Sequence, residues 1–147
     1  MKYVFILFLI VTSCNAQKKH KSSISNFNTD LRLVLRDSYS NYTRPEIQII
    51  KEKNTLQKFF SKINKTRKPG LAVPNIDFTK EMVVIYCAGE QEGNPTYTLE
   101  MNKETDHQIY LSLFEESDIQ IDSNAIITSP FCMYKITATH KEIIFKK

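Results

Sequence analysis

Apolar and polar residues alternate along several short segments of the chain, which is typical of β-strands that bury one face of a sheet. The polar residues 102–108 separate two of these segments and predict a hairpin turn between them. The run Met82–Ala88 is apolar throughout, which predicts a central strand covered on both faces. The other predicted strands lie near 31–36, 46–51, 97–101, 109–113, 131–137 and 143–145.

One segment shows the spacing of an amphipathic helix, with apolar residues three and four positions apart. We predict a helix over about residues 54–65, capped by Asn54 or Thr55. The helix should stop before Lys68-Pro69-Gly70, which suits neither a helix nor a strand interior. The predicted fold class is therefore α+β, with a mostly antiparallel sheet of about six or seven strands and one packed helix. The apolar residues of the helix are Leu56, Phe59, Phe60 and Ile63.

The first residues follow a different pattern, in which an unbroken apolar run leads to a cysteine. Lys2 precedes the run Tyr3–Val11, and Thr12-Ser13-Cys14 closes it. Nine apolar residues are too few for a membrane-spanning helix, which needs about 20. The pattern resembles the lipobox of bacterial lipoproteins, in which the cysteine sulfur receives a diacylglycerol and cleavage makes that cysteine the new N-terminus. An ordinary secretory signal with a chance cysteine is the alternative interpretation.

The lipobox divides the chain into a signal peptide over 1–13, a lipidated flexible tether over 14–29 and a single domain over 30–147. It predicts a cell-envelope protein that is lipid-anchored to a bacterial membrane, with the outer membrane as the expected one. The lysines that follow the anchor either rest on anionic headgroups or belong to a solvated tether. The net charge of +4 is mild and no dense basic and aromatic stripe occurs, which argues against a nucleic-acid partner.

Two cysteines remain if Cys14 is lipidated. Cys87 and Cys132 each lie in an apolar segment. Outside the inner membrane they could persist as a disulfide, provided that their Cα atoms come within about 4.4–6.8 Å. The alternative is two buried thiols that pack as small hydrophobic groups.

The sequence offers little catalytic chemistry. No histidine lies four residues from a second metal ligand on a helix, and no Cys-x-x-Cys motif occurs, so we expect neither a metal site nor a cofactor. The carboxylate groups Glu90/Glu92 and Glu115/Glu116-Asp118 have no evident apolar pocket beside them that would raise one pKa. We therefore expect a protein that is not an enzyme. The three histidines are His20, His107 and His140.

The segment that follows the central strand is the candidate interaction loop. Gly93 and Asn94 tolerate positive φ, and Pro95 favours an extended Asn94. The loop is either a wide hairpin connection or a contact surface displayed at one end of the sheet. Asn94-Pro95-Thr96 resembles the Asn-Pro-Thr loop of chagasin-type cysteine-protease inhibitors, which suggests a protease inhibitor as an alternative function. The candidate residues are Glu92, Gly93, Asn94, Pro95, Thr96 and Tyr97.

Two motifs resemble the PrcB C-terminal domain family over roughly 46–147. Residues 75–90 are similar to its "DFxKEM, apolar strand, GE" core, and residues 126–136 to its "T-x-P-aromatic, apolar strand" segment. The final Ile143–Phe145 is similar to its closing strand. The chain departs from the family at Asn94–Tyr97, where members often carry a Thr-Gly-Gly-Tyr-like turn.

The resemblance implies a non-enzymatic interaction domain. The family is named after PrcB, a lipoprotein that serves as the accessory component of a cell-surface protease complex, and it has no assigned catalytic residues. By this resemblance the expected partners are a membrane, through the N-terminal lipid, and another protein such as a protease. A small-ligand carrier or an enzyme is the remaining alternative.

Overall fold

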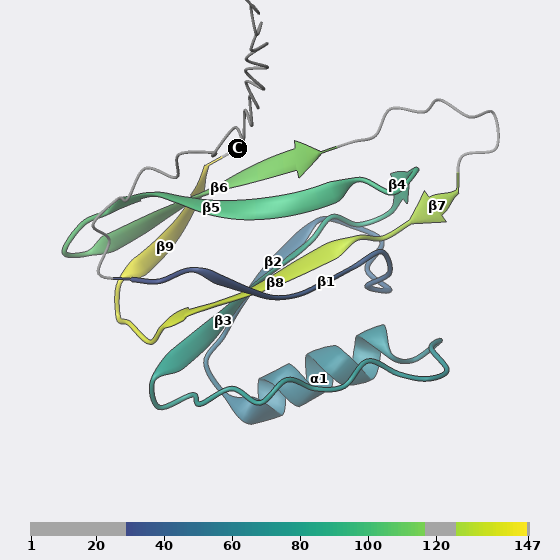
Figure 1. The fold of residues 1–147 in the computed structure, drawn as a ribbon, viewed down its shortest axis with the longest axis horizontal. Helices are drawn as coiled ribbons and strands as arrows, with labels where there is room; N and C mark the ends of the chain where they lie inside the picture. The colour runs from purple at the N-terminus through teal and green to yellow at the C-terminus, as the bar shows by residue number, and fades with distance from the viewer. Residues whose placement is uncertain (1–28, 117–125, 147) are drawn as a thin grey trace, which may run out of the picture.

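The computed structural model describes residues 29–116 and 126–146, which form three layers (Figure 1). Helix α1 (Lys53–Ile63) covers one face of a four-stranded sheet, and a three-stranded sheet covers the other face. The predicted signal peptide, the lipidation site Cys14 and most of the tether lie outside the described residues. Among the described residues, no helix is long and apolar enough to cross a membrane.

The four-stranded sheet forms the middle layer and is antiparallel throughout. Its order is β1-β8-β3-β2, so β3 (Glu81–Cys87) and β8 (Phe131–Thr137) are its inner strands. β1 (Arg32–Asp37) and β2 (Glu46–Ile50) form its edges. The apolar run predicted to be a central strand is β3, and it is buried on both faces as expected.

The three-stranded sheet has the order β5-β6-β9. β5 (Thr96–Glu104) and β6 (Gln108–Glu116) form the predicted hairpin, and the Thr105 N–H donates to the Gln108 carbonyl across its turn at 2.8 Å. β9 (Glu142–Lys146) pairs parallel with β6, and the other strand pairs of the described residues are antiparallel. A two-stranded ribbon of β4 (Gln91–Glu92) and β7 (Ile127–Thr128) lies beside the two larger sheets.

The middle sheet divides the interior into two cores because successive residues of a strand point to opposite faces. Val83 and Ile85 of β3 point toward α1, whereas Met82 and Val84 point toward the three-stranded sheet. The helix-side core also contains Tyr42, Ile50, Leu56, Phe59, Phe60, Ile63, Cys87, Phe131 and Met133. The inter-sheet core also contains Ala88, Tyr97, Leu99, Ile109, Leu111, Cys132, Tyr134 and Ile136.

Helix α1 begins one residue earlier and ends two residues earlier than the sequence predicts. Glu52 holds the N-cap position, with no side-chain cap hydrogen bond, so the expected cap at Asn54 or Thr55 is wrong. The Thr55 hydroxyl instead donates to the Glu52 carboxylate at 2.6 Å. Beyond the C-terminus, the Asn64 side chain exchanges two hydrogen bonds with the Leu71 backbone, at 2.9 and 2.7 Å. These bonds turn the chain back along the helix.

The fold class is confirmed: the described part of the chain is mostly β, with antiparallel sheets and one short helix. The described residues contain nine strands in three sheets rather than six or seven in one. Two of the nine, β4 and β7, are only two residues long, which is too short for an alternating pattern to appear.

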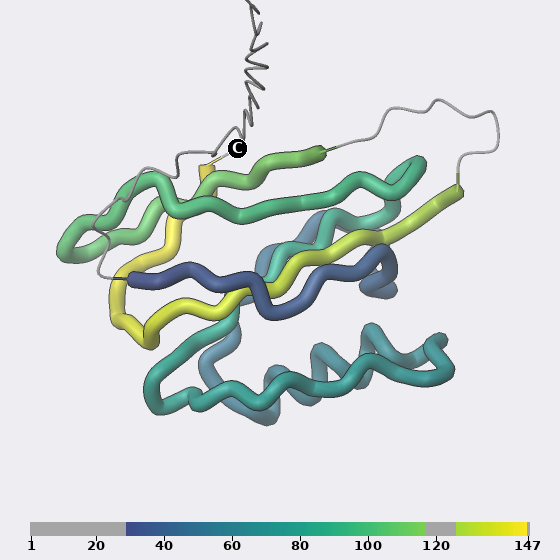
Figure 2. Tube along the Cα trace, viewed as in Figure 1, coloured from purple at the N-terminus to yellow at the C-terminus, as the bar shows by residue number. Residues whose placement is uncertain are grey.

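The two ends of the sheets differ in what they carry (Figure 2). The start of β1, the β5–β6 turn and the β8–β9 turn lie at the left, next to Thr29, whose backbone and hydroxyl both donate to Glu104. The opposite end holds the β4–β7 ribbon and the segment after β1. We call this opposite end the distal end.

Candidate functional site

Three loop segments converge at the distal end and are joined by backbone hydrogen bonds. The segment after β1 lies beside the segment before β8, because Ser40 N–H donates to the Ser129 carbonyl at 2.7 Å and Ser129 N–H donates to the Ser38 carbonyl at 2.9 Å. Ala88, which follows β3, donates to the Pro130 carbonyl at 2.8 Å. These bonds hold the loops in one fixed arrangement.

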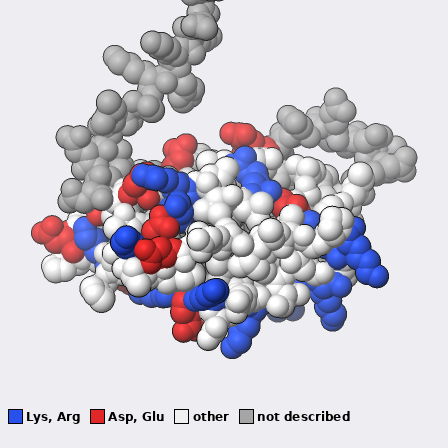
Figure 3. Space-filling view, turned by 60° about the horizontal axis from the view of Figure 1, so that its bottom comes forward, with Lys and Arg blue, Asp and Glu red and all other residues white. Residues whose placement is uncertain are grey.

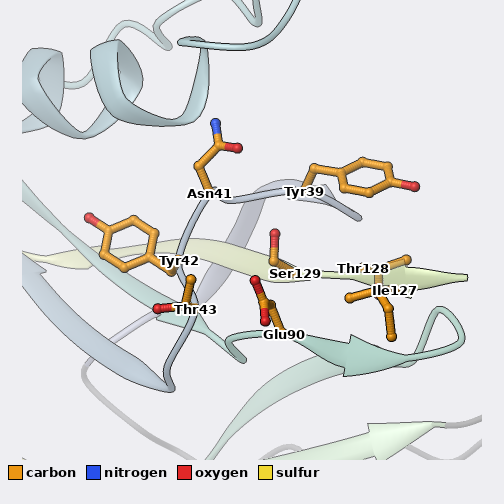
Figure 4. Close-up of a pocket in the computed structure, with 8 residues that line it drawn as sticks. All are labelled: Tyr39, Asn41, Tyr42, Thr43, Glu90, Ile127, Thr128 and Ser129. Carbon is orange, nitrogen blue, oxygen red and sulfur yellow. The ribbon is translucent and has the colours of Figure 1, made fainter.

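A pocket of about 300 Å³ opens between these segments (Figure 4). Figure 4 shows the Glu90 carboxylate directed toward Ser129, and the Tyr39 ring directed away from Tyr42. The lining combines apolar groups, hydroxyl groups and a single carboxylate. The lining residues are Tyr39, Asn41, Tyr42, Thr43, Glu90, Ile127, Thr128 and Ser129.

The rim of the pocket is apolar and exposed, and it groups several large side chains together, whereas large apolar side chains that are exposed singly are common on protein surfaces. Tyr39 is 48% exposed and Ile127 is 56% exposed. Ile126, the neighbour of Ile127, is 66% exposed, the highest value among the large apolar residues that the structure describes. Tyr39 and Ser129 form a parallel β-bridge, so Tyr39 and Ile127 belong to one continuous surface.

The hydroxyl groups of Ser129, Ser40 and Thr128, at or beside the pocket, form hydrogen bonds within and between its loops. Ser129 Oγ accepts a hydrogen bond from the Ser40 backbone at 3.0 Å, and Ser40 Oγ accepts one from the Tyr42 backbone at 3.3 Å. The Thr128 hydroxyl donates to the Gly93 carbonyl at 2.7 Å and thereby ties β7 to the segment after β4. None of these bonds joins a hydroxyl to a histidine or a carboxylate, so the pattern does not activate a nucleophile.

The segment Tyr39–Thr43 is hydrogen-bonded to the C-terminal end of α1. Asn41 adopts a positive φ of 59°, and its side-chain amide donates to the Lys62 and Ile63 carbonyls at 3.1 and 3.0 Å. The Lys62 carbonyl also accepts from the Lys65 N–H and the Ile63 carbonyl from Arg67 Nε, both at 3.2 Å, so Asn41 adds to the hydrogen bonds at this end of the helix. Arg67 pairs with Asp37 and also donates to the Tyr39 carbonyl. These interactions therefore hold in place the backbone segment that carries Tyr39 of the apolar rim.

Tyr42 forms the inner wall of the pocket and remains neutral. Its ring stacks on Phe59 at 6.1 Å between centroids, and Lys62 Nζ lies 3.3 Å from its centroid on the helix side. Burial raises the pKa of Tyr42, although a hydrogen bond from the Gln48 amide at 2.6 Å opposes this shift. A neutral phenol in this position acts as a packing group and not as a base.

The predicted interaction loop is largely built into the fold. Gly93, at a φ of 77°, donates to the Ile126 carbonyl at 2.8 Å. Pro95 and Tyr97 are buried, and the Tyr97 ring packs edge-on against Tyr86 at 5.2 Å. Only Glu92 and Asn94 of the six candidate residues are exposed; Gly93 and Thr96 are half-buried.

This loop is neither a plain hairpin nor a protruding wedge. β3 and β5 lie in different sheets, so the segment carries the chain from one layer to the other through β4. Since Pro95 is buried, Asn94-Pro95-Thr96 does not project as a unit, and the inhibitor hypothesis gains no support from the geometry. The loop borders the distal end, where Glu92 pairs with Ile127 of the apolar rim.

The candidate disulfide is not formed, because Cys87 and Cys132 are free buried thiols. They lie on neighbouring strands, but Cys87 is opposite Phe131 and Cys132 is opposite Tyr86. Cys87 points into the helix-side core and Cys132 into the inter-sheet core, so their sulfur atoms lie on opposite faces of the sheet. Burial raises the pKa of each thiol to about 12.

The other titratable candidates are dispersed. His107 and His140 lie in turns at the end near Thr29, away from the pocket. Glu115 is opposite Tyr97 and helps burial to raise the pKa of that phenol. The described residues include no group of three or more His, Cys, Asp or Glu side chains that could hold a metal ion. Among the described residues, Glu90 is thus the one carboxylate that lines the pocket.

Comparison of the chain with protein-family models, with curated proteins and with solved structures finds no match in any of the three. The pocket itself was not predicted from the sequence. Thr128-Ser129-Pro130 stands out in the sequence only as part of a structural motif, and Tyr39 only as one tyrosine in a polar break. The exposed pair Ile126-Ile127 is the one local signal that could have indicated a surface site.

Proposed function

We propose that this protein is a lipid-anchored component of the bacterial cell envelope whose domain binds another protein through its distal end. The observation that carries the proposal is the exposed apolar rim of Tyr39, Ile126 and Ile127 around an open pocket. Exposed aromatic and aliphatic side chains beside a pocket are typical of protein-binding surfaces.

The rigidity of the site favours binding. Asn41, Ser129 and Arg67 fix the backbone that carries Tyr39, so little conformational entropy remains to be lost when a partner docks. The rim is surrounded by polar groups, including Glu90, Glu92 and Thr43. Specific interfaces are usually organised in this way, with apolar side chains at the centre and polar residues around them.

The position of the site suits an anchored protein. Thr29, the first described residue, is held at Glu104, and the pocket lies at the other end of the sheets. A membrane anchor at Cys14 would therefore leave the distal end free for a partner. The resemblance to the PrcB C-terminal domain family points to an accessory role in a protease complex as the specific form of this function.

Site-specific photocrosslinking in intact cells tests the proposal. A benzophenone amino acid at Tyr39 or Ile127 should yield a crosslink to one defined protein, which mass spectrometry identifies. Leu33 is a matched control, because it is 49% exposed and lies near the start of β1, at the end of the sheets opposite the distal end. The same partner should bind the purified protein in solution and should lose affinity when Tyr39 and Ile127 are both changed to Ser.

Either of two results would overturn the proposal. One is the same crosslinked proteins from Leu33 as from Tyr39 and Ile127. The other is a purified partner that binds the Tyr39→Ser/Ile127→Ser variant as tightly as it binds the wild-type protein.

A further inference from the structure

The net charge of +4 is small because a strongly basic part of the chain is offset by an acidic part. Residues 51–68, which include α1 and its flanks, contain seven Lys or Arg residues and one acidic residue, Glu52. The other described residues contain eight basic and thirteen acidic residues. The helix side is therefore strongly basic, while the rest of the described domain is acidic.

The lysines of this segment are exposed and not neutralised. All six, namely Lys51, Lys53, Lys58, Lys62, Lys65 and Lys68, are exposed. Five ion pairs are formed within the described part of the chain, and Arg67 is the only basic residue of the segment that takes part. Lys62 lies over the Tyr42 ring, which leaves its charge in place.

The geometry of the helix presents these charges on one side. Leu56, Phe59, Phe60 and Ile63 are buried against the sheet, so residues on the opposite side of α1, such as Lys58, face outward. Lys65 lies in the turn that follows the helix and is exposed as well. Figure 3 views the molecule from nearer the helix side. Lys and Arg side chains line the lower right of this view, whereas acidic and basic side chains are mixed at its left. We call the surface formed by the six lysines the basic face.

We propose that the basic face docks on the anionic phospholipid headgroups of the membrane to which the protein is anchored. Each Lys near an anionic membrane surface contributes about 1 kcal/mol, which corresponds to about a fivefold gain in affinity. The apolar side of α1 is already buried in the core. The contact is therefore electrostatic and lies at headgroup level, without insertion among the acyl chains.

The choice of a membrane over a soluble polyanion rests on the proposed anchor at Cys14. The fourteen residues between Cys14 and Thr29 span at most about 50 Å. Stacked sheets are about 10 Å apart, and the helix adds a layer of about the same thickness. The segment is therefore long enough to let the helix side turn toward the membrane. In that orientation the pocket opens sideways, along the membrane plane.

Lysine footprinting of the full-length protein tests this docking. The protein is extracted from membranes and reconstituted into vesicles of phosphatidylcholine alone or of phosphatidylcholine with phosphatidylglycerol. Acetylation of each lysine is then measured by mass spectrometry. Lys58 and Lys65 should be protected only in the anionic vesicles, and added salt should remove the protection. Lys103 and Lys146 are internal controls, because they lie on the other sheet, near Tyr110.

Matched variants complete the test. Lys58→Gln/Lys65→Gln should weaken docking by about thirtyfold and expose Lys53 and Lys68 to acetylation. Lys103→Gln/Lys146→Gln removes the same charge and should leave the protection intact.

Three results would overturn the proposal: no protection on anionic vesicles, equal effects of the two variants, or protection that appears only with a soluble polyphosphate on neutral vesicles. The mass of the N-terminal peptide reports lipidation separately. A failure of the anchor is therefore distinguished from a failure of docking.

Discussion

Replacing Glu104 with Gln tests what holds the domain together at the end where the chain enters it. The Glu104 side chain is 6% exposed, and that of Lys141 is 22% exposed. The Glu104 carboxylate accepts hydrogen bonds from Lys141 Nζ at 2.8 Å, from the Thr29 hydroxyl at 2.7 Å and from the Thr29 backbone at 3.1 Å. Gln keeps the shape but removes the charge, and it leaves the Lys141 ammonium without a counter-charge.

The expected loss of stability follows from this burial. Removing one partner of a buried ion pair costs about 3–5 kcal/mol. Because water reaches part of Lys141, we expect the Glu104→Gln change to lower the free energy of unfolding by about 2–3 kcal/mol at neutral pH. For a domain of this size, that corresponds to a fall in Tm of about 8–12 °C.

The effect should depend on pH in a defined direction. Burial alone would raise the pKa of Glu104, but hydrogen bonds from Lys141 and Thr29 outweigh it and hold the pKa below its ordinary value of 4.5. A carboxyl with a lowered folded-state pKa stabilises the fold above its unfolded pKa and loses that contribution as the pH falls through the folded value. The difference between wild type and Glu104→Gln should therefore be complete at neutral pH and shrink below 4.5.

Urea unfolding at neutral and acidic pH measures both effects. Asp77→Asn is the control, because the Asp77–Lys80 pair is exposed, at 3.6 Å, and exposed ion pairs contribute little to stability. The reasoning is refuted if Glu104→Gln costs no more than Asp77→Asn at neutral pH. It is also refuted if the cost persists unchanged in acid.

Two further predictions concern the thiols and the glycines of the distal end. Native protein should show almost no alkylation of Cys87 or Cys132 at about pH 8, since burial raises both pKa values to about 12, and unfolding in urea should make both fully reactive; rapid labelling of either native thiol would contradict the buried arrangement. Gly89→Ala should lower the free energy of unfolding by more than Gly93→Ala. Both glycines have positive φ, which costs about 1–2 kcal/mol for Ala, but only at Gly89 would the new Cβ meet backbone, at 2.7 Å from Arg44. Equal losses in chemical denaturation would refute this distinction.

Local patterns predicted the elements of the fold well because each element carries its own periodicity. The β3 run is buried on both faces, and the 102–108 segment contains the hairpin turn. The helix was found from four apolar residues, although its cap was not. Glu52 makes no side-chain cap hydrogen bond, and tertiary packing of Leu56, Phe59 and Phe60 stabilises the helix without one.

The arrangement of the elements was not predictable from these patterns. An alternating strand buries one face equally well against a helix or against a second sheet, so nothing local separates the β5-β6-β9 sheet from the middle sheet. The parallel pairing of β9 with β6 is likewise set by a distant partner. The pocket depends on contacts such as Ser40–Ser129, which join residues far apart in sequence and leave no local pattern.

The pairing of β1 with β8 also determines when the fold can be completed. β1 lies at the edge of its sheet, and β8 is its only neighbour there, with Arg32 opposite Lys135. During synthesis, β1 therefore cannot pair until β8, which lies near the end of the described chain, has also been made. Such long-range pairing slows folding. Slow completion of this sheet would suit the exported protein proposed above, because a chain must be unfolded to pass through a translocation channel.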